Sequence, residues 1–391
     1  MTSIVVWFGF LDIGLGHGLR NKFAEAKALG NKNLGRYYVS TTYVLLALIS
    51  SVFFLLFLLV NNNIPCANIL NIKTVNNYEL TILALIIFGS FSLRLFLNLI
   101  TTITTADQYP AIGELVNLIN KIVVFISILV LINSSKVSII NISLIYSIIP
   151  IIVLVITTLL LFNSKYKDYR PSIKFFKLKY VVKLFNLGWK FLIIQIGGLI
   201  LIASDNFIIS NIYIPDLVVP YQISNRYYSI PLFIFGILIQ PLWSAITDAN
   251  AKKDYVWIKD ATKKYAILFL FFSVIIIGMT LIAPAIYNFW IGEKIVIPLY
   301  LNILWACIII IRMINAIPAS YLNGMGYTFI TVITSTFIII INIPLSYFLA
   351  HVIGNVSGVQ IATLFCILLL AILRLLQCHN ILSGRKGVWT K

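Results

Sequence analysis

Residues 11–38 have the sequence LDIGLGHGLRNKFAEAKALGNKNLGRYY, and a degenerate copy follows 223 residues later. In the first copy an acidic residue, Glu25, precedes Ala-x-Ala and then a cation, Arg36. In the second copy Asp248 and Lys259 take the same places. Both copies lie between two apolar runs. Composition bias alone does not produce such a match, so the pattern indicates an internal duplication and a chain of two related halves.

The composition is that of a membrane protein. Hydrophobic residues make up 60% of the chain and charged residues only 10%, and the mean hydropathy is +1.00. The apolar runs are about 20 residues long, which is the length that crosses roughly 30 Å of hydrocarbon as a helix. These features predict an all-α polytopic membrane protein.

Eleven apolar spans can be placed along the chain. They are 1–16, 38–60, 79–103, 113–132, 139–162, 186–212, 217–247, 265–290, 298–318, 329–349 and 358–377. The duplication divides them into two pseudo-symmetric bundles of 5 and 6 helices. We therefore expect an N-terminal bundle at 1–162, a basic linker at 163–183, a six-helix bundle at 184–378 and a tail at 379–391.

The net charge of +17 is explained by membrane topology. Twenty of the 29 Lys and Arg residues lie in four segments, 17–37, 163–183, 248–264 and the C-terminal tail, whereas the loops of opposite parity contain only Lys73, Lys136 and Lys294. Cytoplasmic loops are enriched in cations. The four basic segments and the C-terminus are therefore expected in the cytoplasm, and nucleic-acid binding is not needed to explain the charge.

An odd number of spans with a cytoplasmic C-terminus places Met1 outside, although no signal peptide precedes it. The repeated loop follows the first span of the earlier half but the second span of the later half. The first helix of the earlier half is therefore expected to be missing, as in a truncated chain.

Two of the basic segments are expected at the membrane surface. Segment 17–37 predicts a short interfacial helix with Leu19, Phe23 and Ala26 on one face and Arg20, Lys22 and Lys27 elsewhere, or else a simple connection. Segment 163–183 predicts a linker lying on membrane lipids of the anionic inner leaflet, where each cation contributes about 1 kcal/mol.

Ionisable residues inside the spans are the candidate site residues, because such groups are costly in lipid. Arg94, Arg226 and Arg312 lie deepest, and Arg94 and Arg312 are repeat partners, each followed fifteen residues later by a Tyr. Repeat transporters place substrate between their halves, so these arginines are candidate substrate-binding cations. Snorkelling or pairing within one half is the alternative. Arg374, Lys121 and Lys190 lie near span ends, where snorkelling is favoured.

The remaining candidates are polar groups in the later half and one earlier asparagine. Asp205, with Lys190, is a candidate for ion coupling or for an ion pair, and Asp205 shares its half with Arg226. Asn98, Gln195 and Asn206 either line the cavity or form interhelical hydrogen bonds. The excess of arginine over carboxylate favours an anion such as a phosphate, a diphosphate or an acidic sugar.

Four cysteines and three histidines are scattered without metal-ligand spacing, and no GxxxxGK[ST] motif occurs. No metal, cofactor or nucleotide hydrolysis is therefore expected.

Four separated stretches of the sequence resemble a known family. They are WFGFLDIGLGHGLRNKFAEAKALGNKNLGRYYVST, SLRLFLNLITTITTADQYPAIGELVNLINK, YRPSIKFFKLKYVVKLFNLGWKFLIIQ and PLWSAITDANAKKDYVWIKDATKK. They resemble the O-antigen and capsule-type polysaccharide flippases of the multidrug, oligosaccharidyl-lipid and polysaccharide exporter superfamily. The resemblance covers essentially the whole chain.

The resemblance implies two six-helix bundles that form a V-shaped cleft in the bacterial inner membrane. The implied activity is alternating-access transfer of an undecaprenyl-diphosphate-linked oligosaccharide to the periplasmic face, driven by a proton or sodium gradient. A polysaccharide polymerase and a chain-length regulator would be its partners in O-antigen or lipopolysaccharide synthesis. The family's cationic cavity maps onto Arg94, Arg226 and Arg312. The resemblance also implies that the chain is not an enzyme, so no catalytic residues carry over.

Three other functions stay open. A drug/cation antiporter of the same superfamily would need cavity carboxylates. A membrane-embedded polysaccharide polymerase or glycosyltransferase would need a large outer loop and paired carboxylates, and the longest outer loop has only 17 residues, 61–77. An inactive truncated flippase is the third.

Overall fold

In a computed structural model of the chain, the described residues are 12, 14–61, 77–133, 138–213, 217–292, 295–385 and 387–390. They are almost entirely helical. The chain divides into two compact units, Met1–Trp189 and Lys190–Lys391, which are called unit 1 and unit 2 below. The boundary falls within one long helix.

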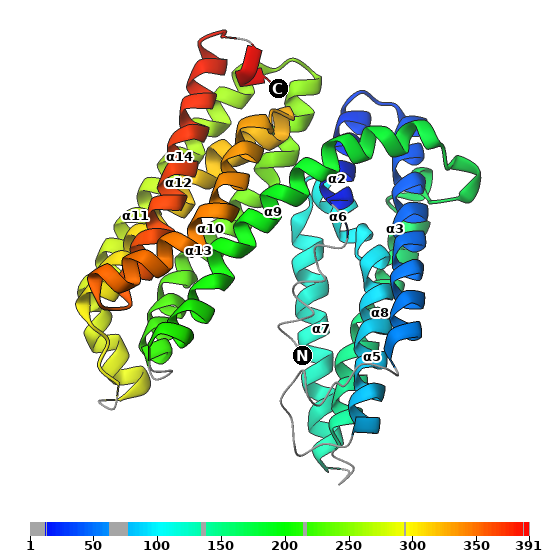
Figure 1. Cartoon of the computed structure of the whole chain (residues 1–391). Coiled ribbons are helices and arrows are strands. Elements are labelled where there is room, and N and C mark those ends of the chain that lie inside the picture. The colour runs from blue at the N-terminus through cyan, green and yellow to red at the C-terminus, as the bar shows by residue number, and fades with distance from the viewer. Residues whose placement is uncertain are drawn as a thin grey trace. The chain divides into compact units, whose positions relative to one another are not determined.

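In unit 1 the helices run side by side as a bundle (Figure 1). They are α2 (Leu15–Ala28), α3 (Lys32–Asn61), α5 (Asn77–Leu97), α6 (Leu99–Ala106), α7 (Pro110–Asn133) and α8 (Ile139–Asn163). The short 3-10 helices η2 (Lys167–Tyr169) and η3 (Ile173–Phe175) follow, and then the first turns of α9 (Leu178–Ile212).

Unit 2 is also a bundle. It contains the rest of α9, then α10 (Val218–Ala251), α11 (Tyr255–Ile291), α12 (Leu299–Met325), α13 (Phe329–Ile353), α14 (Ser357–Leu382) and the 3-10 helix η5 (Gly387–Thr390). Local chemistry sets the helix ends. Asp254 caps α11 by accepting a hydrogen bond from the Trp257 amide at 3.0 Å. Gly326, at φ 79°, ends α12 in the left-handed conformation that glycine adopts without strain.

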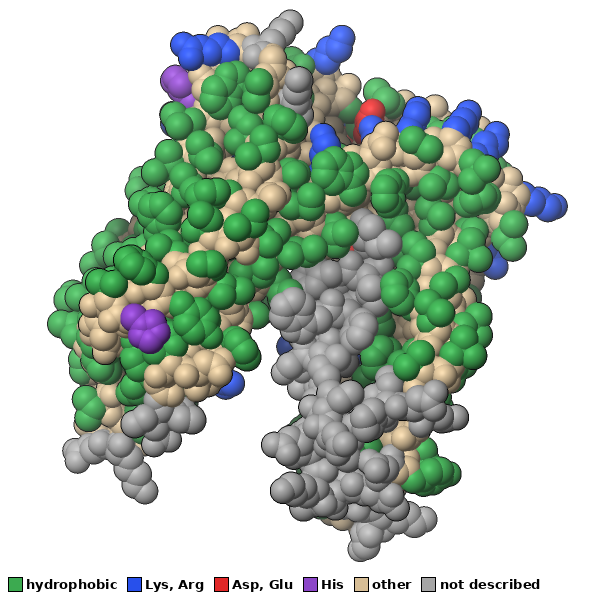
Figure 2. Space-filling model, viewed as in Figure 1, with side chains coloured by type: hydrophobic (Ala, Val, Ile, Leu, Met, Phe, Trp, Pro, Cys, Tyr) green, Lys and Arg blue, Asp and Glu red, His purple; other side chains and the backbone are tan. Residues whose placement is uncertain are grey.

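The structure confirms the all-α membrane fold. Ten helices among the described residues are long and apolar enough to cross a membrane, and each matches one predicted span from 38–60 onward, with α5 and α6 together forming one of them. The predicted span 1–16 lies mostly outside the described residues. Hydrophobic side chains cover the sides of both bundles (Figure 2), and several are largely exposed to the surroundings, such as Leu59 and Leu281. Such surfaces are those of a protein whose solvent is lipid.

Helix packing repeats between the units. In unit 1, α3 packs on α5, α5 on α8, α7 on α8 and α2 on α3. In unit 2, α11 packs on α12, α12 on α14, α13 on α14 and α10 on α11. Each pair in the second series is the repeat counterpart of a pair in the first.

Several helices begin earlier than their predicted spans. Helix α9 begins at Leu178 rather than 186, so the last residues of the predicted linker 163–183 are helical, and α11 begins at Tyr255 rather than 265. These extensions contain lysines, which hydropathy excludes from a span but which helices accommodate outside the hydrocarbon. In α2 the predicted apolar face is confirmed, because Leu19, Phe23 and Ala26 are fully buried. Arg20, which lies elsewhere on the helix, is buried as well.

In each unit, ion pairs or hydrogen bonds join the helix ends and turns that lie next to the basic segments. In unit 1, Lys27 and Lys165 both contact Asp107 in the turn between α6 and α7. In unit 2, Thr247 donates to the Gly324 carbonyl at 3.1 Å, and Gln377 donates to the Tyr327 carbonyl at 3.2 Å. The ends of α10, α12 and α14 therefore meet, as the alternation of basic loops predicts.

Candidate functional site: a charged cavity in each unit

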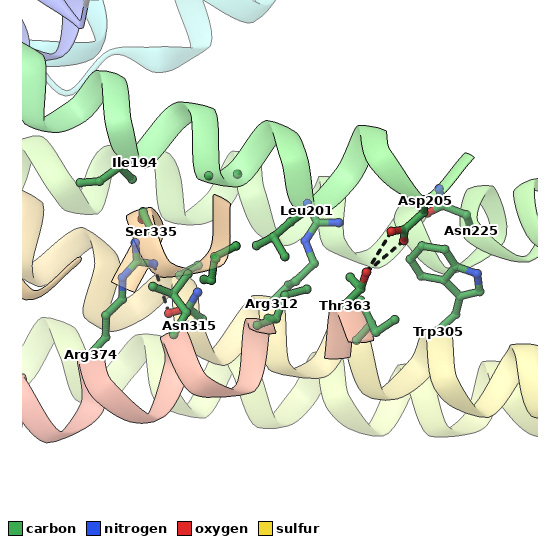
Figure 3. Close-up of a pocket in the computed structure, with 17 residues that line it drawn as sticks. Ile194, Leu201, Asp205, Asn225, Trp305, Arg312, Asn315, Ser335, Thr363 and Arg374 are labelled. Atoms are coloured by element: carbon green, nitrogen blue, oxygen red, sulfur yellow. Dashed lines mark hydrogen bonds between the residues drawn. The ribbon is translucent and has the colours of Figure 1, made fainter. Parts of the chain in front are cut away.

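Unit 2 contains a cavity of about 230 Å³ between its helices (Figure 3). Helices α9, α10, α12, α13 and α14 line it. Its polar side chains are Asp205, Asn225, Arg312, Asn315, Ser335, Thr363 and Arg374. The volume is below the roughly 300–1,000 Å³ of drug-sized ligand pockets, so the cavity fits a small charged group or an ion rather than a large molecule.

Two glycines of α9 make room for this cavity. A Cβ at Gly197 would meet Cβ of Ser335 on α13 at 3.0 Å, so glycine permits the close approach of the two helices. A Cβ at Gly198 would meet nothing within 4 Å, because this side of the helix faces open space. The pair brings α13 close to α9 while leaving the neighbouring wall open.

Asp205 is buried in the wall of this cavity, at 2% exposure. Its carboxylate accepts hydrogen bonds from the Tyr221 hydroxyl at 2.5 Å and from Thr363 Oγ1 at 3.0 Å. None of the ion pairs between described residues includes it. A buried carboxylate without a cation is costly to keep charged, so it readily takes up a proton or a cation.

The two arginines of the cavity differ in their partners. Arg374 is buried, and its Nη1 donates to Asn315 Oδ1 at 3.1 Å while its Nε donates to Thr331 Oγ1 at 3.4 Å. Arg312 is half-buried, and its guanidinium extends from α12 toward α9 (Figure 3). No hydrogen bond or ion pair joins Arg312 to another described residue. Its donors are therefore available to an anion.

Unit 1 has a cavity of about 270 Å³ at the repeat position, lined by Asp12, Arg94, Asn98 and Thr102 among others. The Asp12 carboxylate accepts hydrogen bonds from the backbone amides of Gly14 at 2.9 Å and Gly16 at 3.3 Å. It therefore caps the first turn of α2. Arg94 and Asn98 are exposed on α5 and in the break before α6.

The predicted site residues are thus divided between the two cavities and the surface outside them. Arg312 and Asp205 share the unit 2 cavity, and Arg94 and Asn98 share the unit 1 cavity. Arg226 is exposed on α10 and lines neither cavity. The assignment of these residues to substrate or ion binding stays a prediction.

The other predicted polar residues lie on α9 outside the cavity lining. Asn206 accepts a hydrogen bond from Gln222 of α10, which is the interhelical alternative. Gln195 is half-buried. Lys190 precedes Asp205 by fifteen residues on one helix, so the two Cα atoms are roughly 22 Å apart and cannot form an ion pair.

Sequence reasoning missed the role of Arg374, which it placed at a span end where the side chain can snorkel. The structure buries it instead, because Asn315 and Thr331 supply hydrogen-bond acceptors within the bundle. A signal was present. Thr363 and Arg374 are eleven residues apart, which is three helical turns and puts both on one face of α14.

The cavities offer no evident metal centre, since nowhere in the described ranges do three or more His, Cys, Asp or Glu side chains gather.

Comparison with known proteins identifies the fold. No protein-family model matches the chain, and no curated protein matches its sequence. Solved structures do match. A crystal structure of a mutant of the Vibrio cholerae MATE transporter VcmN is 13% identical, with a TM-score of 0.83 over 100% of this chain and 89% of that one.

Two further structures agree. One is described as the outward-facing conformation of a multidrug resistance MATE family transporter of the MOP superfamily. It is 14% identical, with a TM-score of 0.79 over 97% of this chain and 86% of that one. A MATE structure in the bent conformation has a TM-score of 0.80 at 14% identity, over the same shares of the two chains. The chain therefore has the fold of MATE transporters, and the predicted all-α membrane fold of two helical bundles is confirmed.

Proposed function

We propose that this chain is an exporter that moves its cargo across the bacterial inner membrane by alternating access, and that it is not an enzyme. The observation that supports this best is the fold, which is shared along nearly the whole chain with transporters. Among those structures are straight, bent and outward-facing conformations. Two bundles with a charged cavity inside a membrane-spanning unit suit the same kind of motion.

Asp205 is our candidate for ion coupling. It lies deep within unit 2, accepts hydrogen bonds from two hydroxyl groups and has no cationic partner among the described residues. Uptake of a proton or a sodium ion would remove the cost of its buried charge. An ion gradient acting at this carboxylate would bias unit 2 between two conformations.

The comparisons favour a drug or cation antiporter as the specific function. One matching structure is described as a multidrug resistance transporter. In such an antiporter Asp205 would bind and release the coupling ion while a cationic cargo moves in the opposite direction. This function predicts that a lipophilic cation is the transported species.

A specific observation favours a second function, the flipping of an undecaprenyl-diphosphate-linked oligosaccharide. The unit 2 cavity contains two arginines and one carboxylate, and Arg312 has no partner among the described residues. A guanidinium binds phosphate oxygens through paired donors and stays charged in a low dielectric. A cavity of about 230 Å³ accommodates a phosphate group while the lipid and the sugars stay outside it. Under this function a polysaccharide polymerase and a chain-length regulator would act on the product.

The two functions can be distinguished in proteoliposomes. Purified chain is reconstituted under a proton or sodium gradient, and the movement of a fluorescent lipophilic cation is compared with that of a fluorescent polyprenyl-diphosphate sugar. Gradient-dependent transport of the cation alone supports the antiporter, and transport of the diphosphate alone supports the flippase. Absence of both, with correctly folded protein and both gradients tested, would contradict the proposal of an exporter.

The Arg312→Ala variant sharpens this comparison. Removal of the cavity cation should reduce diphosphate transport by roughly tenfold or more and should leave or increase cation transport. Lys264→Ala, an exposed lysine on α11, is the control and should change neither.

A further inference from the structure

The first turns of α9 have an apolar stripe that faces away from the rest of unit 1. Leu178, Val182, Phe185 and Trp189 are spaced at i, i+4, i+7 and i+11, and are 73%, 58%, 47% and 39% exposed. Such spacing puts all four on one side of the helix. Residues 173–189, which include η3, are called the amphipathic segment below.

The opposite side of this segment is fixed to unit 1. Tyr180 and Leu184 are buried, and the Tyr180 ring stacks on Tyr37 with 5.3 Å between centroids. It also meets Tyr38 edge-on at 5.1 Å. A Cβ at Gly18 would lie 2.9 Å from the Leu184 carbonyl oxygen, so α2 and α9 are in close contact. The apolar stripe is therefore held outward by a well-packed helix.

Cations flank the apolar stripe. Lys174, Lys177, Lys179 and Lys183 are all exposed. Asp168 is the single acidic residue between 163 and 189, and it already forms an ion pair with Lys32 at 2.7 Å. Figure 2 shows Lys and Arg side chains gathered over this end of unit 1, where the connection between α8 and α9 lies in Figure 1. The surface is thus both apolar and strongly positive.

The length of α9 puts this surface at the edge of the membrane. Its 35 residues extend over about 52 Å, whereas roughly 20 residues cross the hydrocarbon. If residues 191–212 cross the bilayer, the amphipathic segment lies at the depth of the lipid headgroups. An apolar stripe bordered by lysines is the pattern of helices that lie in that layer.

We propose that the amphipathic segment is a docking surface for anionic phospholipids. The four stripe residues enter the boundary between headgroups and acyl chains, and the four lysines contact lipid phosphates. The occupant is a lipid surface because the same helix continues into the bilayer and because the charge of the segment is complementary to acidic headgroups. The inference does not depend on the cargo.

Depth-dependent fluorescence quenching in the full-length chain tests the proposal. The four native cysteines are replaced by serine, and a Val182→Cys substitution introduces a single thiol that carries an environment-sensitive fluorophore. The protein is reconstituted in phosphatidylcholine alone or mixed with phosphatidylglycerol, each with a spin-labelled lipid as quencher. Quenching at position 182 is expected to increase at least twofold when phosphatidylglycerol is present.

Position 274, labelled through Val274→Cys, is the matched control. Val274 of α11 is 69% exposed and lies in a stretch, 265–292, without any charged residue. Quenching there should be the same in both lipid mixtures, because no cations draw it toward acidic headgroups. A variant with Lys174, Lys177, Lys179 and Lys183 changed to Gln should lose the increase at position 182 and keep the signal at position 274.

Three results would overturn the proposal. They are equal quenching at position 182 in both mixtures, an increase that persists in the four-glutamine variant, and no quenching at 182 while 274 is quenched normally. The third would indicate that the segment stays outside the lipid, which leaves its surface to another occupant such as an acidic protein. A variant that fails to fold would lose quenching at position 274 as well, and the single variants Lys179→Gln and Lys183→Gln then replace it in the same comparison.

Discussion

Each unit buries a carboxylate, but among the described residues only the carboxylate of unit 1 is paired with cations. In unit 1, Asp107 lies at the end of the bundle, where it contacts Lys27, Lys165 at 3.1 Å and the Tyr166 hydroxyl at 3.0 Å. In unit 2, Asp205 lies within the membrane-spanning part of α9 and contacts only hydroxyl groups of Tyr221 and Thr363 among the described residues. One carboxylate is neutralised by the protein and the other is not.

The difference separates a structural charge from an exchangeable one. A carboxylate that is already paired with two lysines gains little from a proton or a metal cation. A buried carboxylate with hydroxyl donors alone gains much from either, and it changes its charge when the ion leaves. We therefore expect Asp107 to stabilise the fold and Asp205 to act during transport.

The largest expected effect is that of Asp205→Asn on transport. The amide still accepts hydrogen bonds from Tyr221 and Thr363, but it cannot exchange an ion, so gradient-driven transport should fall by roughly tenfold or more. Thermal unfolding should be unchanged or shifted upward because a buried charge is removed. The rate in proteoliposomes and the unfolding midpoint test this together. Full transport with a lower midpoint would reverse the roles of the two carboxylates.

Asp107→Asn should lower the stability of the fold and leave transport nearly unchanged. It removes the negative charge that Lys27 and Lys165 contact. Both lysines are partly exposed, at 40% and 37%. The loss is therefore expected at about 1 to 3 kcal/mol of unfolding free energy, below the value for fully buried pairs. Transport per folded molecule should stay within about twofold of the wild type, as measured after normalising to monodisperse protein. A normal midpoint combined with lost transport would contradict this assignment.

Each of the two carboxylates accepts a hydrogen bond from a tyrosine, and removal of that hydroxyl group compares their roles again. Tyr166→Phe removes one of several partners of Asp107 and should cost about 1 kcal/mol of stability without slowing transport. Tyr221→Phe removes the closest donor to Asp205 and should slow transport by several-fold. Unfolding midpoints and initial transport rates of the two variants are compared side by side. Equal effects on transport would show that the contacts of the two carboxylates are equivalent.

The smallest effect concerns the exposed pair of Lys32 and Asp168. The hydrogen bond from Lys32 lowers the pKa of the Asp168 carboxyl below its ordinary value. Because the pKa is lower in the folded chain, the contribution of the pair is complete at neutral pH and is lost as the pH falls below the ordinary range of an aspartate. Asp168→Asn should shift the unfolding midpoint less than Tyr166→Phe does at pH 7, and high salt should abolish the shift. A shift that persists in high salt would contradict a surface role.

The sequence predicts the spans well because hydropathy measures the apolar content that a helix in lipid requires. It predicts helix starts poorly at α9 and α11, since Lys179 and Lys259 lie on helical turns outside the hydrocarbon, where apolar content gives no information. Intramembrane charge singles out Arg312 and Asp205, and the structure places both in one cavity.

Other features need the packed structure. Burial of Arg374 depends on Asn315 and Thr331, which come from two other helices. The contacts of Asp107 come from Lys27 and Lys165, which are distant in the chain and have no spacing that relates them. Whether a charge is paired is a property of side chains that meet across helices, and a single sequence does not contain it.

The most direct test of the account is a comparison of two arginines in one unit. Arg312 lines the unit 2 cavity without a partner among the described residues, whereas Arg226 is exposed outside both cavities. Transport of the fluorescent polyprenyl-diphosphate sugar in proteoliposomes is measured for wild type, Arg312→Ala and Arg226→Ala at matched amounts of folded protein. We predict that Arg312→Ala reduces this transport by roughly tenfold or more and that Arg226→Ala stays within about twofold of wild type. Equal rates for all three, or a loss confined to Arg226→Ala, would contradict it.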